Sequence, residues 1–188
     1  FAENEARISA VLSGLLDHLE AAVAQACDPA GPLQFGPIRL HTLLADGTDR
    51  MASQMALARG YELVAPLPFG RRLNRTINSL TTDPAEARRL LAGEDALDPQ
   101  IQAHAAAIRN LSDKARVLQL ADADERLAAL FLDKLDAPDD QAKAQLFAAE
   151  CSRRVALAGR ILIEQSDLLI AVWDGKSTAS VGGTGHTI

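Results

Sequence analysis

This sequence has few aromatic residues and fewer basic than acidic side chains. Aromatic residues make up 4% of its 188 residues, which leaves no platform on which the bases of a single-stranded nucleic acid would stack. The formal net charge is −6, whereas a protein that binds a duplex needs a basic face to neutralise the phosphates. We therefore expect no duplex nucleic-acid partner, although the charge still permits a small anion in a local pocket.

The chain also has few cysteines and no long hydrophobic run. Its two cysteines, Cys27 and Cys151, are far apart and neither belongs to a Cys-x-x-Cys pair, a pattern typical of neither a zinc site nor a disulfide framework. We expect no metal, no cofactor and a reducing, cytoplasmic location. No apolar run approaches the roughly 18 residues of a membrane-spanning helix, so we expect no membrane partner.

Apolar periodicity divides the chain into alternating helices and strands. Helical spacing predicts helices over residues 4–26, 48–59, 83–91, 99–111, 122–135 and 141–165. Short apolar runs predict strands over residues 38–44, 61–69, 115–120 and 168–173. This alternation indicates an α/β fold with a doubly wound, mainly parallel, Rossmann-like sheet.

Residues 1–188 are expected to form a single domain that lacks elements at both ends. The first helix has no strand before it, and a helix should begin near Ile188, so we expect flanking elements before Phe1 and after Ile188. Residues 70–113 are less regular and rich in Arg, Asp and Thr. We interpret them as a partly helical insertion over the sheet edge, after the strand at 61–69. That strand is counted as the third of the sheet, because we expect another strand before Phe1.

The first candidate site is the turn after the strand at 38–44, formed by Asp46, Gly47, Thr48, Asp49 and Arg50. Ligands of open α/β sheets bind outside the carboxyl ends of the strands, where a glycine lets backbone N–H groups approach an anion. Asp46 and Asp49 would hold a ribose hydroxyl, and Arg50 a phosphate. Thr48 or Asp49 would equally serve as a simple cap of the next helix.

The second candidate site follows the strand at 168–173 and contains Asp174, Gly175, Gly182, Gly183 and Thr184. The two adjacent glycines and the threonine offer N–H groups and a hydroxyl to a phosphate at the positive end of a helix. A plain surface loop would have the same composition. Asp174 would accept a hydrogen bond from a ribose or a base.

Other polar residues give weaker signals. Arg71, Arg72 and Arg75 follow a predicted strand and would reach a phosphate, although most such arginines are solvated. His104 is expected on a helix surface, because no second His or Cys lies at metal-ligand spacing. No nucleophile with an adjacent base is recognisable.

Three short motifs occur in order over most of the chain: an acidic-Gly-x-Asp-Arg turn, a strand that ends Pro-Leu-Pro, and Asp-x-Leu-Ile-Ala-x-Trp-Asp-Gly followed by Gly-Gly-Thr. In these motifs the chain resembles the SLOG superfamily. This Rossmann-like group includes the LOG phosphoribohydrolases, the DNA-processing protein A family and nucleotide-sensing domains of bacterial defence systems. The resemblance implies a nucleotide-binding domain.

The LOG enzymes carry Pro-Gly-Gly-x-Gly-Thr-x-x-Glu, in which the glutamate assists cleavage of an N-glycosidic bond. Here Val181 replaces the proline and His186 the threonine, and the glutamate position would follow Ile188. We therefore favour a sensor or carrier of a phosphorylated ribose ligand, such as ADP-ribose or another nucleotide. The alternatives are a LOG-like hydrolase of nucleoside monophosphates and an interaction module with no ligand. A homodimer through residues 141–165 stays open, because a helix lying on a sheet has the same pattern.

Overall fold

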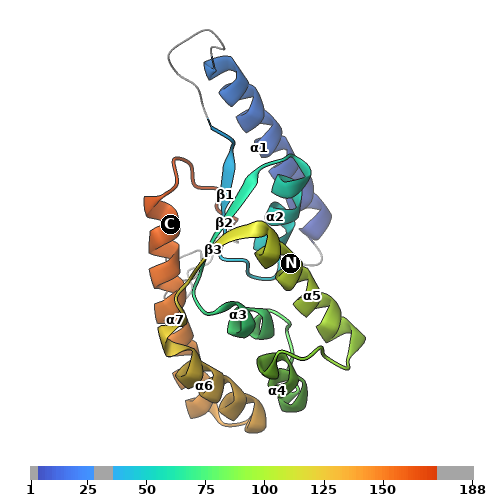
Figure 1. Ribbon diagram of the computed structural model, residues 1–188, viewed down its shortest axis with the longest axis vertical. Helices are drawn as coiled ribbons and strands as arrows, with labels where there is room; N and C mark the ends of the chain where they lie inside the picture. Colours follow the sequence, from blue (N-terminus) through green and yellow to red (C-terminus); the bar gives the residue numbers. More distant parts are fainter. Residues whose placement is uncertain (1–3, 28–35, 173–188) are drawn as a thin grey trace.

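The computed structural model describes residues 4–27 and 36–172, and these form a mixed α/β fold (Figure 1). Its helices are α1 (Glu5–Ala26), α2 (Thr48–Ala58), α3 (Arg71–Ile77), α4 (Pro84–Ala92), α5 (Pro99–Lys114), α6 (Asp124–Asp136) and α7 (Gln141–Glu164), with a short 3-10 turn, η2 (Ala121–Ala123), before α6. The strands are β1 (Arg39–His41), β2 (Glu62–Leu67) and β3 (Ala115–Gln119). None of these helices is long and apolar enough to cross a membrane.

The three strands form one parallel sheet in the order β1-β2-β3. Leu63 of the central strand is in register with Leu40 on one side and with Ala115 on the other. The sequence-based prediction of an α/β class with a parallel sheet is therefore confirmed. A parallel pair needs a crossover, and the crossovers here are the helical segments between the strands.

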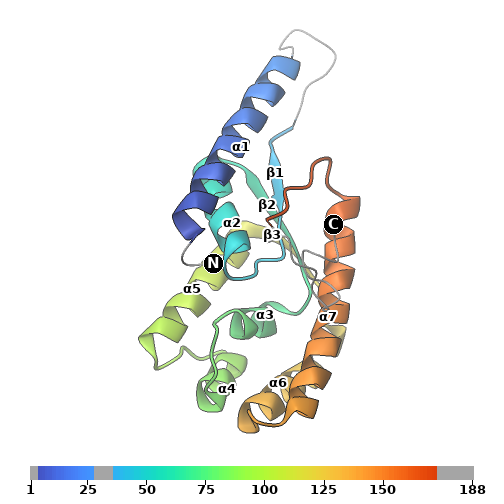
Figure 2. The same cartoon turned by 180° about the vertical axis from the view of Figure 1, so that it is seen from behind.

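Helices cover both faces of the sheet (Figures 1 and 2): α1, α2 and α5 lie on one face, and α7 lies on the other. Alternate residues of a strand share a face, and the β2 residues Leu63, Ala65 and Leu67 are at most 2% exposed. Leu16 of α1, Ala56 of α2 and Leu111 of α5 join the same core cluster. The apolar stripe predicted for residues 141–165 is used inside the chain, since α7 packs on α6 and β2.

A second apolar region lies beyond the carboxyl ends of the strands, where α3, α4 and α6 pack together with α7. The rings of Phe131 and Phe147 lie 5.3 Å apart at its centre. Within the segment expected to be an insertion, only α3 and α4 lie in this region. Helix α5 packs against both α3 and α2 and leads directly into β3.

The strand predicted at 168–173 is not formed over residues 168–172, and this prediction was wrong for those residues. They have no regular secondary structure, and Leu168 and Leu169 are 60% and 47% exposed. Ile170 does pack against the core cluster of the sheet. The segment thus returns to the sheet without pairing with it.

The reason lies in β1, which is shorter than the predicted strand at 38–44. A strand needs a neighbour that offers backbone donors and acceptors along its length, and β1 has three residues. β1 ends at His41, and Leu44, the last residue of the predicted strand, adopts a left-handed φ of +53°. An apolar run predicts burial, but it does not supply the partner that a strand requires.

Candidate functional site

The turn between β1 and α2 holds the first group of predicted site residues. Asp46, Gly47, Thr48, Asp49 and Arg50 lie at the carboxyl end of β1, and Thr48 begins α2. The second predicted group, Asp174, Gly175, Gly182, Gly183 and Thr184, lies outside the described residues, as do Trp173 and the rest of the chain to Ile188. The described part of the candidate site is therefore the first group.

Gly47 has the backbone conformation that the sequence predicted for a glycine turn. Its φ is +89° and its ψ is −124°, a region that side chains other than hydrogen disfavour. Gly47, not Thr48 or Asp49, is the N-cap of α2, and within residues 4–27 and 36–172 no side chain makes a capping hydrogen bond there. The first N–H groups of α2 lie at the positive end of the helix dipole, and no side chain of the described residues caps them.

Side chains that follow β1, or that belong to α3 and its C-cap, hold the turn in place. The Leu44 N–H donates to Thr42 Oγ1 over 3.1 Å, and the Leu44 carbonyl accepts from Asn74 Nδ2 over 3.4 Å. The Asp46 N–H donates to Asn78 Oδ1 over 3.0 Å. A positive φ is unfavourable for a bulky residue such as Leu44, so these contacts hold a strained turn at the carboxyl edge of the sheet.

The Asp49 carboxylate accepts hydrogen bonds from other residues of the turn. Oδ2 accepts hydrogen bonds from Thr42 Oγ1 over 3.2 Å and from the Ala45 N–H over 3.4 Å. Burial raises the pKa of this carboxyl above its usual 3.8, and the hydrogen bonds from Ala45 and Thr42 oppose the rise. Asp49 therefore connects the end of β1 to the first turn of α2.

Asp46 binds two side chains from different helices. Its Oδ1 accepts from Arg50 Nε over 2.8 Å and lies 3.4 Å from His104 Nδ1 of α5. The side chains of Asp46, Arg50 and His104, which we call the Asp46 cluster, are 16%, 27% and 35% exposed. The cluster is thus held by the fold and still reaches solvent.

Sequence reasoning did not place His104 in the site. It expected a helix-surface residue, and in the structure the side chain is half-buried beside Asp46, which is 58 positions away. Asn74 and Asn78 were also missed, because the helix α3 that positions them was not predicted. No local pattern in the sequence connects these residues to the turn.

The three arginines that follow β2 hold helices together instead of facing the turn. Arg71 Nη1 donates to the Ser112 carbonyl over 2.7 Å, and Arg72 Nη1 to the Leu91 carbonyl over 3.4 Å. Arg75 is 8% exposed and donates to the Leu90 carbonyl over 2.9 Å. Burial lowers the pKa of Arg75. These contacts attach α3 to α4 and α5.

Gly70, at the N-terminus of α3, contacts a carboxylate that sequence reasoning also missed. Its N–H donates to both oxygens of Asp124, over 3.1 and 2.9 Å. A Cβ added at Gly70 would overlap Asp124 Oδ2. Burial raises the pKa of Asp124. This contact joins the end of β2 to the start of α6.

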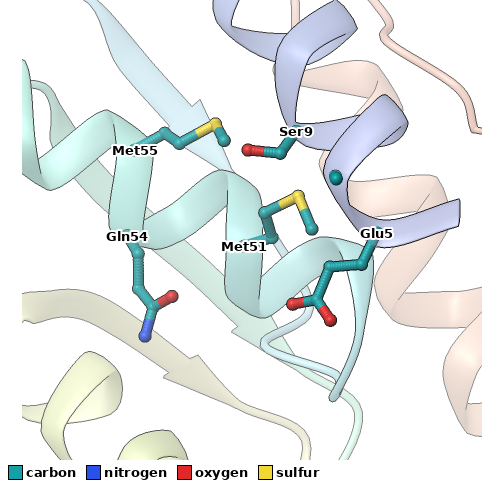
Figure 3. A pocket seen from close by; sticks show the side chains of 6 residues that line it. Glu5, Ser9, Met51, Gln54 and Met55 are labelled. Carbon is teal, nitrogen blue, oxygen red and sulfur yellow. The ribbon is translucent and has the colours of Figure 1, made fainter. Parts of the chain in front are cut away.

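The surface has open pockets away from the Asp46 cluster. One of about 540 Å³ lies between α1 and α2, where Met51 and Met55 face Glu5 and Ser9 (Figure 3). Another of about 300 Å³ lies at the amino ends of the strands beside Gly60. Within residues 4–27 and 36–172, no group of three or more His, Cys, Asp or Glu could hold a metal ion.

Chemically, the turn and the Asp46 cluster offer backbone N–H donors, a guanidinium, a carboxylate and an imidazole at one edge of a parallel sheet. These groups suit a ligand that combines an anionic group with hydroxyls. Comparison with known proteins found no matching family model, no matching curated protein and no matching solved structure.

Proposed function

We propose that this chain is a Rossmann-like, SLOG-type domain that binds a nucleotide derivative, such as ADP-ribose, at the carboxyl ends of its parallel strands. The observation that carries this proposal is the conformation of Gly47, the N-cap of α2, whose φ is +89°. Among the residues described, no side chain caps this helix N-terminus. Such an N-terminus offers backbone N–H groups and a positive dipole end to a phosphate. The Asp46 cluster lies beside it and supplies further polar groups.

The remaining predicted residues complete the proposal. Gly182, Gly183 and Thr184 would hold the phosphate from a second side, and Asp174 and Gly175 would contact the ribose or base. In this proposal residues 70–113, which contain α3, α4 and most of α5, form the insertion over the sheet edge. The domain would act as a cytoplasmic sensor or carrier that needs no cofactor.

A LOG-like phosphoribohydrolase is the second candidate, because the structure brings His104 to Asp46. A histidine oriented by a carboxylate is a common arrangement for a general base. The two functions differ in turnover: a hydrolase would release free base from a nucleoside monophosphate, whereas a sensor or carrier would return the nucleotide intact.

The proposal is tested by thermal unfolding in the presence of ADP-ribose, AMP and other nucleotides. A ligand at 100 times its dissociation constant should raise the free energy of unfolding by about 2.7 kcal/mol. A panel without any stabilising compound would contradict nucleotide binding and favour an interaction module.

Arg50→Ala then locates the site by calorimetric titration with the compound that stabilises the chain most. Loss of a hydrogen bond to a charged group should weaken binding by about 1.5–3 kcal/mol. Arg153→Ala is the control, because Arg153 is an exposed arginine of α7 that pairs with Glu150 on the same helix. Equal affinities of wild type and a folded Arg50→Ala would remove Arg50 from the site.

A further inference from the structure

Arg75 of α3 carries a buried positive charge. The residue is 8% exposed, and its Nη2 donates to the carbonyls of Leu90 and Glu94 over 2.9 and 3.1 Å. Both acceptors are uncharged, and within residues 4–27 and 36–172 its buried Nε has no hydrogen-bond partner. A buried charge is costly unless an opposite charge and a full set of hydrogen bonds compensate it. Arg75 therefore has a donor and a charge left over.

Three more arginines meet Arg75 at the end of α4, and we call the four the α4 arginine cluster: Arg72, Arg75, Arg89 and Arg109. Arg89 pairs with Glu94 over 2.9 Å, and Arg109 with Asp95 over 3.6 Å. The side chains of both acidic residues are more than half exposed. Four guanidiniums thus face two carboxylates, which leaves an excess of two positive charges in a chain whose formal net charge is −6.

A structural role accounts for part of this cluster. Arg72 and Arg75 donate to carbonyls at the end of α4, as basic side chains at a helix C-terminus commonly do. Capping does not explain why α5 brings Arg109 to the same place. Burial lowers the pKa of Arg75, Arg109 and Arg72 lower it further, and Asp95 raises it. Like charges held together in this way destabilise a folded chain unless an anion lies among them.

We propose that the α4 arginine cluster binds the phosphate group of a small anion, and that Asp95 is the internal carboxylate that this phosphate displaces from Arg109. A phosphate monoester carries a charge of about −1.5 to −2 near pH 7, which matches the local excess of positive charge. Its oxygens accept hydrogen bonds from several guanidiniums at once. The side chains of Arg109 and Asp95 are 48% and 62% exposed, so the anion reaches them from solvent.

This site differs from the phosphate contact that sequence reasoning expected after the strand at 61–69. That expectation grouped Arg75 with Arg71, whereas in the structure Arg71 donates to the Ser112 carbonyl near the end of α5. Arg109, which sequence reasoning did not consider, joins Arg75 instead. The α4 arginine cluster shares no residue with the turn at 46–50 or with the Asp46 cluster. The proposal therefore does not depend on nucleotide binding.

Titration with orthophosphate, followed by NMR at the Arg75 Nε–H and the Gly93 amide, tests the proposal. Both signals should shift in a saturable way in wild type, because Gly93 follows α4 and lies beside the Arg72 guanidinium. Loss of a hydrogen bond to a charged group predicts that Arg109→Gln weakens this binding about tenfold or more. Arg153→Gln is the control, since Arg153 is an exposed arginine of α7. It should bind as wild type does.

Asp95→Asn gives an effect of opposite sign. It removes the internal competitor, so it should strengthen phosphate binding about twofold to fivefold, the range for loss of an exposed ion pair. Asp17→Asn is the matched control, because Asp17 is an equally exposed carboxylate of α1 that pairs with Arg59. This variant has the same net charge as Asp95→Asn and should bind phosphate as wild type does.

Glycerol 3-phosphate distinguishes the two sources of the anion. Tighter binding than orthophosphate at the same signals assigns the site to a phosphorylated metabolite, and equal or weaker binding assigns it to free phosphate. Absence of saturable shifts with both compounds would overturn the proposal. Unchanged affinity of a folded Arg109→Gln, or equal gains from Asp95→Asn and Asp17→Asn, would show an adventitious ion only and would overturn it as well.

Discussion

At the scale of single residues, Asp49 was predicted to contact a ligand, but its carboxylate accepts hydrogen bonds from Thr42 and Ala45. Burial raises its pKa above 3.8, so the neutral acid is more favoured in the folded protein than in the unfolded chain. The stability that the protonated Asp49 carboxyl contributes is fully present below pH 3.8 and is lost as the pH rises through the raised pKa.

The isosteric variant Asp49→Asn, which does not titrate, measures this effect. We expect the free energy of unfolding of wild type, relative to Asp49→Asn, to fall as the pH increases from about 4 to about 8. Urea unfolding of both proteins across this range gives the difference. A difference that stays constant or grows with pH would contradict a buried Asp49 carboxyl.

Gly70 gives a second prediction at this scale. An added methyl group would overlap the Asp124 carboxylate, so Gly70→Ala should displace it from the Gly70 N–H and lower the free energy of unfolding by about 1–3 kcal/mol. Gly159→Ala is the control, because this helical glycine has open space above it and alanine should stabilise a helix by about 0.5–1 kcal/mol. Equal effects of the two substitutions in urea unfolding would refute the close approach.

At the scale of elements, α1 is fastened to the sheet by a polar contact. The Tyr61 hydroxyl donates to Glu20 Oε1 over 2.9 Å, and burial with this bond raises the pKa of Tyr61 from 10.0 to about 12. Arg59 adds a 2.8 Å ion pair with Asp17. The contact therefore joins the second half of α1 to the start of β2.

Tyr61 is the single tyrosine of the chain, so ultraviolet absorbance of tyrosinate reports this contact directly. Stability from the neutral phenol is complete below pH 10 and is lost as the pH rises toward about 12. Glu20→Gln should shift the absorbance midpoint toward 10.0. A wild-type midpoint near 10 in folded protein would show that α1 does not bury Tyr61.

The elements also show what the sequence could predict. Helices with an apolar stripe were found because one face of each packs on a core, as with α7. Helix α3 was missed because only Leu73 and Ile77 mark its buried side. The turn at 46–50 follows from glycine chemistry, which is local. His104 joins it through tertiary packing, which no local pattern contains.

At the scale of the whole molecule, stability should depend on β2, which is buried between helices on both faces. Leu63 is 2% exposed, and Leu118 of the neighbouring strand is 51% exposed. Leu63→Ala should lower the free energy of unfolding by about 2–5 kcal/mol, and Leu118→Ala should change it by less than about 0.5 kcal/mol. Denaturant unfolding of both variants measures these changes. If Leu118→Ala lowered the free energy of unfolding as much as Leu63→Ala, the buried core around β2 would be refuted.

The central claim is that a nucleotide binds at the carboxyl edge of the sheet, and amide NMR during titration with ADP-ribose tests it most directly. We predict that the amide signals of Gly47, Thr48 and Arg50 shift in a saturable way. The signal of Gly60, at the amino edge, should remain in place. Saturable shifts around Gly60 without any at Gly47, or no shifts at all, would contradict the account.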